Sequence, residues 1–103
     1  MTQGTTPTIS IQLPPDIPVS DLTDARLTLC QNGTEKKCVA LADLTVDTDT
    51  NTLSLTLTQA ETLDLSAVYY LDVQLKVNYN GTIMASQIAS YDVNEILCRT
   101  HPI

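Results

Sequence analysis

The sequence predicts an all-β protein, and three features of the 103-residue chain support this prediction. Apolar and polar residues alternate over long stretches, which is the period of a strand with one buried face. Asn-Gly pairs at 32–33 and 80–81 follow or separate such stretches, and this pair suits a two-residue hairpin turn in which both central residues need positive φ. Threonine is abundant between the apolar positions, where its branched side chain fits the solvated face of a sheet.

The first half of the chain is expected to form five strands. Ile9, Ile11 and Leu13 alternate with polar residues until Pro14, where the chain breaks because proline cannot donate a hydrogen bond to a sheet. A looser acidic turn at 47–51 precedes another alternating run that contains Leu53. The five expected strands are 6–13, 24–31, 35–40, 43–47 and 52–58.

The second half contains the longest alternation, which predicts a strand at 67–79, followed by another strand at 82–93. One face of the longer strand is expected to carry Ala67, Tyr69, Leu71, Val73, Leu75, Val77 and Tyr79. Before this strand, Thr58-Gln59-Ala60-Glu61 is a capping-box sequence, in which the Thr58 and Glu61 side chains each bond the other residue's backbone amide. We therefore expect one short helical turn near 59–63.

About seven short strands in a chain of this length predict one domain over 1–103, a sandwich of two antiparallel sheets. The segment from Ser66 to Leu71 resembles the start of strand F in immunoglobulin-like domains, where a tyrosine folds back onto the preceding corner. Tyr69 is the candidate tyrosine, or simply another core aromatic, and Leu71 occupies the usual cysteine position. Because Trp is absent and that cysteine is missing, an antibody-type domain is excluded. The predicted fold is an immunoglobulin-like antiparallel β-sandwich without a disulfide.

Charge and composition argue against several classes of partner. The net charge of −7 and the pI of about 4.2 disfavour nucleic acid, because phosphate binding needs Lys and Arg. They equally disfavour an anionic membrane surface. No apolar run approaches the roughly 20 residues of a membrane span, and no signal peptide is visible at the N-terminus. We expect synthesis in a cytosol.

The cysteines are expected to be free thiols. Their number is odd, Cys30, Cys38 and Cys98, and no secretion signal accompanies them. A Cys30–Cys38 bridge would require a three-residue loop, whereas a tight Asn32-Gly33 turn would place Cys30 opposite Glu35. Zinc binding by Cys98 and His101 with the other two cysteines does not fit the usual ligand spacing.

Other candidate sites are better explained as turns. Asp47, Asp49 and Asn51 match the opening of a calcium loop, but the glycine and the glutamate that such a loop needs are both threonine here, at 52 and 58. The sequons at 32–34 and 80–82 coincide with the expected hairpin turns. Asp21 and Asp24 are expected to be solvated turn residues, and the single histidine, His101, stands near the chain end. We expect no enzyme activity, no cofactor and no metal.

Several short motifs resemble a family of small proteins from the structural modules of phages and prophages. They are Gln3-Gly4-Thr5-Thr6-Pro7-Thr8 before a strand ending Leu13-Pro14, Leu29-Cys30-Gln31-Asn32-Gly33, Leu57-Thr58-Gln59-Ala60-Glu61-Thr62-Leu63, and Ala85-Ser86 with Val93 through Leu97. Asp21-Leu22-Thr23-Asp24-Ala25 also resembles, more weakly, the N-terminal sandwich domain of phage upper baseplate proteins. The resemblance implies a virion component made in the bacterial host cytoplasm.

The expected function is that of a non-enzymatic structural protein of the tail, baseplate, fibre or capsid decoration. Its partners would be other phage structural proteins, copies of itself, or both. The arm of Gly4, Thr5, Thr6 and Pro7, which we expect to be unanchored, is the candidate contact, because it and the following strand carry no charge. Two alternatives remain: a carbohydrate- or receptor-binding module using Tyr70 and Tyr91, and a regulatory binding protein that never enters the particle.

Overall fold

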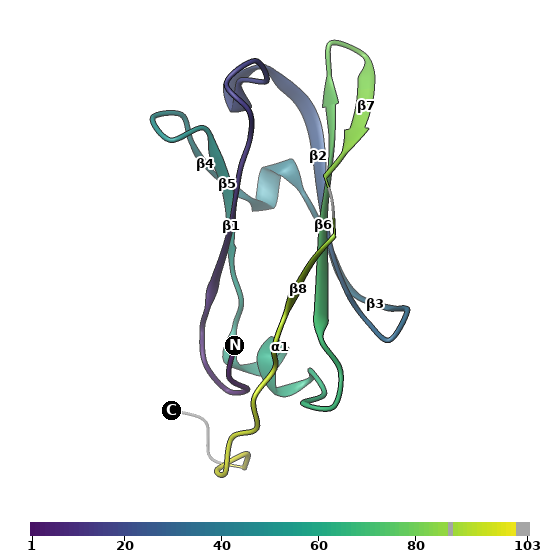
Figure 1. The fold of residues 1–103 in the computed structure, drawn as a ribbon. Helices are drawn as coiled ribbons and strands as arrows, with labels where there is room; N and C mark the ends of the chain where they lie inside the picture. The colour runs from purple at the N-terminus through teal and green to yellow at the C-terminus, as the bar shows by residue number, and fades with distance from the viewer. Residues whose placement is uncertain (87, 101–103) are drawn as a thin grey trace.

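The computed structural model describes residues 1–86 and 88–100, and it confirms a sandwich of two antiparallel sheets (Figure 1). The smaller sheet has the order β1-β5-β4, with β1 at Thr8–Gln12, β5 at Thr52–Thr56 and β4 at Thr45–Asp47. The larger sheet has the order β3-β2-β6-β7, with β8 pairing the same side of β6 as β7. Its strands are β2 (Leu22–Gln31), β3 (Thr34–Ala40), β6 (Leu71–Tyr79), β7 (Thr82–Ala85) and β8 (Ala89–Tyr91).

The order of the strands is that of an immunoglobulin-like sandwich. If β1 to β6 are taken as strands B, C, C′, D, E and F, and β7 with β8 as strand G, the two sheets read B-E-D and C′-C-F-G. In that fold strand A pairs with the outer side of strand B. Among the described residues no strand pairs with the outer side of β1, which leaves β1 at the edge of its sheet.

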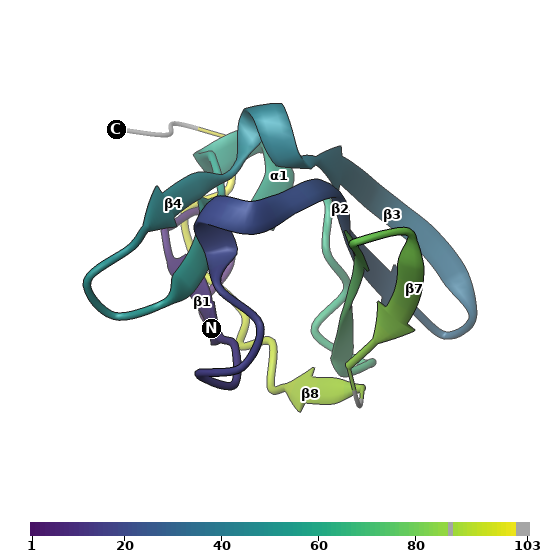
Figure 2. The same cartoon turned by 90° about the horizontal axis from the view of Figure 1, so that it is seen from above.

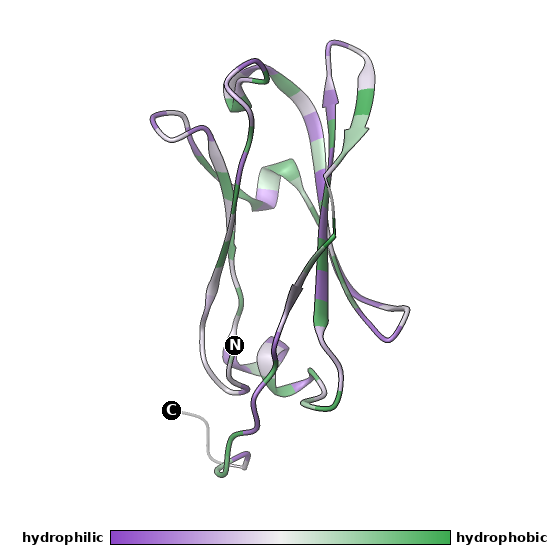
Figure 3. Ribbon diagram, viewed as in Figure 1, coloured by the Kyte–Doolittle hydropathy of each residue, from purple (hydrophilic) through white to green (hydrophobic). Residues whose placement is uncertain are grey.

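The core lies between the sheets because the apolar positions of the strands alternate. Figure 3 shows the alternation of hydrophobic and hydrophilic residues along β2 and β6. On β6, Leu71, Val73, Leu75 and Val77 are buried, and Leu71 has no exposed surface at all. The buried residues from the other strands that join them are Ile9, Leu22, Ala25, Leu27, Leu29, Val39, Leu53 and Leu55.

The predicted strand at 82–93 is wrong as a single strand. β7 and β8 both pair with β6, but their registers differ by one residue, so that Ala85 faces Lys76 whereas Ala89 faces Val73. At the interruption the Ser86 amide donates to the Leu75 carbonyl at 2.7 Å, and the Ser86 hydroxyl accepts from the Leu75 amide at 2.9 Å. A side-chain oxygen thus replaces a backbone acceptor, and the edge strand is broken there.

The predicted start of the long strand at 67 is also wrong, because β6 begins at Leu71. Residues 66–70 form a loop held by Gln31, a buried polar residue at the end of β2. Its side-chain amide donates to the carbonyls of Ser66 and Tyr69 at 2.8 and 3.2 Å, and its oxygen accepts from the Ser66 amide at 2.9 Å. A glutamine therefore fastens the corner that Tyr69 was expected to fasten. Tyr69 itself is 45% exposed, so it is neither a corner tyrosine nor a core residue.

The helical turn is confirmed as α1, at Gln59–Leu63, with both bonds of the capping box. The Glu61 amide donates to the Thr58 hydroxyl at 3.2 Å, and the Thr58 amide donates to the Glu61 carboxylate at 2.9 Å. Two 3-10 turns make the other crossings between the sheets, η1 at Val19–Asp21 and η2 at Leu41–Asp43. The expected strand at 43–47 is shortened by η2 to the three residues of β4.

Candidate protein-interaction surface

The segment 1–7 is anchored to its own chain, contrary to the expectation of a free arm. A parallel bridge joins Thr2 to Asn94, and the Gln3 and Asn94 amides donate to the carbonyls of Asn94 and Met1 at 2.9 and 2.8 Å. Gln3 is buried, and its side chain contacts the Leu65 carbonyl and the Arg99 guanidinium.

The predicted contact residues Gly4, Thr5, Thr6 and Pro7 continue this anchored segment. The Gly4 carbonyl accepts from the Gln59 side chain at 3.2 Å, and the Thr5 carbonyl accepts from the Thr62 hydroxyl at 2.9 Å. Pro7 accepts from the Leu57 amide at 2.9 Å. The backbone carbonyls of Gly4, Thr5 and Pro7 thus accept hydrogen bonds from the rest of the chain. The side chains of Thr5 and Thr6, in contrast, are exposed. Contact with a partner at this segment stays a prediction.

No disulfide joins Cys30, Cys38 and Cys98, as expected. Cys30 lies opposite Glu35, as the tight turn requires, and Cys38 lies opposite Thr28. Among the described residues no group of three or more His, Cys, Asp or Glu side chains could hold a metal ion. His101 lies outside the described residues.

The side chains of Asp47 and Asn51 in the acidic turn make hydrogen bonds within the fold. Asp47 accepts from the amides of Asp49 and Thr50 at 3.0 and 3.3 Å, which caps the turn. Asn51 has φ of 54° and points its side chain at the loop between β1 and β2. Its amide donates to the carbonyls of three loop residues, and its oxygen accepts from the amide of a fourth; they are Leu13, Pro14, Ile17 and Val19. This role of Asn51 was missed from the sequence, where only its place in an acidic turn was visible.

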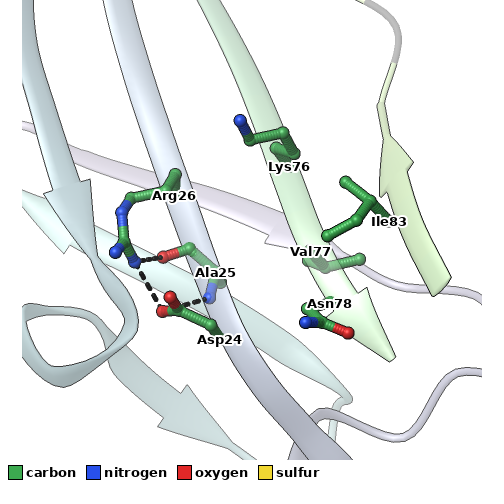
Figure 4. A pocket seen from close by; sticks show the side chains of 7 residues that line it. All are labelled: Asp24, Ala25, Arg26, Lys76, Val77, Asn78 and Ile83. Carbon is green, nitrogen blue, oxygen red and sulfur yellow. Dashed lines mark hydrogen bonds and ion pairs between the residues drawn. The ribbon is translucent and has the colours of Figure 1, made fainter. Parts of the chain in front are cut away.

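A shallow hollow of about 220 Å³ on the large sheet holds the Asp24 carboxylate (Figure 4). Asp24 accepts from Arg26 at 2.5 Å and from the Ala25 amide at 2.8 Å. The hydrogen bond from Arg26, and then that from Ala25, lower the pKa of Asp24 below its ordinary value. Lys76 lies directly across the strands from Arg26, and Ile83 on β7 is 61% exposed at the rim. Asp24 is therefore a charged partner of Arg26 at neutral pH, as is usual for a solvated acid.

The edges of the two sheets differ in charge. The exposed edge strand β3 carries Glu35, Lys36 and Lys37, and the three-residue edge strand β4 ends on Asp47. The edge strands β1, β7 and β8 contain no charged residue. Charged side chains on an edge disfavour its pairing with another chain, so β1 and the edge formed by β7 and β8 are the two unprotected edges of the sandwich.

Between these two edges runs an apolar groove of about 300 Å³. Figures 1 and 2 show β1 and β7 on the same side of the molecule, with β8 between them toward the chain ends. The groove is lined chiefly by Ile11, Leu13, Ile17, Leu75, Val77 and Met84. Met84, Ile11, Leu13 and Ile17 are only partly buried against the core, so this apolar surface remains open to solvent.

A second exposed apolar feature is the loop between α1 and β6. Val68 is 83% exposed and Tyr70 is 62% exposed, next to Tyr69. Tyr91, the other tyrosine considered for sugar stacking, packs partly against the core. Exposed aromatic rings therefore gather at this loop and not at Tyr91.

The fold and these edges define the chain as an immunoglobulin-like sandwich that is open on the side between β1 and β7. No family model, curated protein or solved structure matches it. Among the described residues no helix is both long enough and apolar enough to cross a membrane.

Proposed function

We propose that the chain is a non-enzymatic structural protein of a phage particle, acting through protein–protein contacts in the tail, baseplate, fibre or capsid decoration. The observation that carries the proposal is the uncharged, unpaired edge of β1 beside an apolar groove. Assembly proteins use such edges to add a strand from a neighbour, because backbone hydrogen bonds supply affinity without a dedicated pocket. The likeness of the sequence motifs to phage structural modules supplies the context.

The acidic surface is compatible with this role. A net charge of −7 keeps a small sandwich soluble before assembly, because acidic copies repel one another. The partners proposed are other virion proteins, copies of the chain, or both, with neither nucleic acid nor membrane among them.

Mass spectrometry of purified particles tests the proposal. Finding the protein in particles at a fixed ratio to a known tail or capsid protein supports it. Absence from particles, with the protein abundant in the infected cell, supports the regulatory alternative and overturns the proposal. Charged substitutions of the exposed threonines, Thr5→Lys and Thr6→Lys, test the arm: incorporation should fall if the arm touches a neighbour, and Thr23→Lys, on the exposed face of β2, is the matched control.

A carbohydrate-binding function is the second candidate, and the exposure of Tyr69 and Tyr70 favours it. Tyrosine rings can stack on sugar faces when they are exposed on a loop. A glycan array with the wild type and with Tyr70→Ala separates the two functions. Glycan binding that is lost in Tyr70→Ala would support the lectin function, whereas no binding of the wild type to any glycan would rule that function out.

A further inference from the structure

The outer edge of β1 has a regular set of unused backbone groups. The Leu57 amide donates to the Pro7 carbonyl, and the Leu13 amide donates to the Asn51 carbonyl, both at 2.9 Å. In an antiparallel ladder the residues that bond the neighbouring strand alternate with residues that point away from it. Residues 7, 9, 11 and 13 therefore bond β5, and the amides and carbonyls of Thr8, Ser10 and Gln12 point outward.

These outward groups lie at the place where strand A seals an immunoglobulin-like sandwich. No other strand of the described chain pairs there, so Thr8, Ser10 and Gln12 present three donors and three acceptors to solvent. β1 spans five residues, and Pro14, the next residue of the outward set after Gln12, has no N–H group to extend the free edge further. An occupant must therefore be a short extended strand.

We propose that this occupant is β1 of a second copy of the chain, paired antiparallel about a two-fold axis at Ser10. The inference rests on the proposed function, of which it names the partner. In this register Ser10 faces Ser10 of the partner, and Thr8 faces the partner's Gln12. Three pairs of outward residues, each exchanging two hydrogen bonds, use all the free groups of both edges. A shift by two residues in either direction would leave some of them unpaired.

The side chains of β1 suit this pairing. The strand reads Thr-Ile-Ser-Ile-Gln, so that polar residues meet polar residues on the outer face and Ile9 meets the partner's Ile11 on the inner face. No charge opposes another across the axis, although the chain as a whole carries −7. The same register brings the partner's Pro7 beside Leu13, at the rim of the apolar groove, which would then be partly covered. The two small sheets would form one six-stranded sheet.

The other uncharged edge, formed by β7 and the three-residue β8, does not offer such a match. The outward residues of β7 are Ile83 and Ala85, because the two-residue hairpin places Thr82 and Met84 in bonded pairs with β6. β7 is one residue shorter than β1, and the interruption at Ser86 separates it from β8. Pairing of β1 with β7 of the next copy would be head-to-tail and would produce open chains instead of closed dimers.

Sedimentation and light scattering of the purified protein, from about 10 µM to about 1 mM, test the proposal. We expect a monomer–dimer equilibrium that added salt shifts toward the dimer, since salt screens the repulsion between two acidic copies. Ser10→Lys should raise the dimer dissociation constant about tenfold or more, because it places two like charges on the axis. The matched control is Ser54→Lys, since Ser54 is directly opposite Ser10 on β5 but away from the edge.

Amide hydrogen exchange of the wild type gives a readout that needs no variant. At high concentration the amides of Thr8, Ser10 and Gln12 should become protected, and at low concentration they should exchange rapidly. A monomer at 1 mM, a dimer equally weakened by Ser54→Lys, growth to open chains, or protection at Ile83 and Ala85 instead would overturn the proposal. Presence of the protein in particles is measured separately, so either idea can fail alone.

Discussion

At the scale of single residues, two buried or half-buried amides hold the loops of this sandwich. Asn51 fastens the β1–β2 loop with four hydrogen bonds, and Gln31 fastens the α1–β6 loop with three. Both residues bond backbone groups that have no strand to pair with. Among the described residues, no buried side-chain nitrogen or oxygen lacks a partner, so these amides are used fully.

Asn51→Ala is expected to lower the free energy of unfolding by about 3 kcal/mol. About 1 kcal/mol comes from the positive φ, which alanine adopts with strain, and the rest from lost hydrogen bonds. The control is Asn32→Ala, because Asn32 has nearly the same φ, 50°, in an exposed turn. Urea unfolding of both variants measures the difference. Equal losses would show that the side-chain bonds of Asn51 contribute nothing.

Gln31→Ala is expected to lower the free energy of unfolding by about 2 kcal/mol, since the Ser66 amide and two carbonyls lose a partner in a part-buried loop. Tyr69→Phe should leave the melting temperature unchanged, because the ring is exposed and the corner is held by Gln31. Thermal melts of both variants check this. If Gln31→Ala left the melting temperature unchanged and Tyr69→Phe lowered it, the corner would be held by Tyr69 and not by Gln31.

At the scale of elements, α1 is one helical turn that ties the two sheets together. Its capping box begins the helix, and the Glu61 carboxylate also pairs with Lys37 on β3. Burial raises the pKa of Glu61, but hydrogen bonds from Lys37 and from the Thr58 amide lower it by more, so that the net pKa lies below the ordinary 4.5. The ionised form is thus the one that the fold stabilises.

Because the folded-state pKa of Glu61 is lowered, its contribution is present above pH 4.5 and is lost as the pH falls through the folded-state value. Glu61→Gln keeps the reach of the capping box but not the charge, and it should cost about 0.5–1 kcal/mol at pH 7. The difference from wild type should shrink below pH 4.5. Denaturant unfolding at pH 7 and pH 3 measures it, with exposed Glu35→Gln as control. A difference that is constant with pH would contradict the ion pair.

At the scale of the whole molecule, the chain ends close part of the side that β1 and β7 leave open. Residues 1–3 pair in parallel with residues 92–94, and Arg99 donates to the Gln3 side chain at 2.6 Å and to the Leu63 carbonyl at 3.0 Å. These contacts join segments from opposite ends of the sequence. The groove between β1 and β7 is the part of this side that they do not reach.

Deletion of residues 1–3 is expected to lower the free energy of unfolding by about 3 kcal/mol, because the chain loses backbone bonds to 92–94 and the buried Gln3 side chain. Hydrogen exchange at 92–99 should speed up with it. Thr2→Ala, which keeps the backbone of the segment, is the control. Unchanged exchange at 92–99 would show that the tail is held without the first residues.

The strand positions, the hairpin turns and the capping box could be predicted because each depends on neighbours in sequence. The same local reasoning failed at Tyr69, where the alternation continues past the point at which β6 begins. The break at Ser86 was not predicted either, because a one-residue change of register depends on the pairing with β6 and does not alter the pattern of apolar residues. The roles of Gln31, Asn51 and Gln3 could not be predicted, because their partners lie far away in sequence. The separations are 35 to 38 residues for Gln31, 32 to 38 for Asn51, and 62 or more for Gln3.

The all-β sandwich could be predicted from the sequence, because the period of the apolar residues and the turn residues are local properties. Which edges remain open depends on tertiary contacts. An edge is open or closed according to which distant strand packs beside it, and here the first seven residues fold back onto α1 and 92–94 instead of extending along β1. That placement leaves an uncharged strand and an apolar groove, on which the proposed assembly depends.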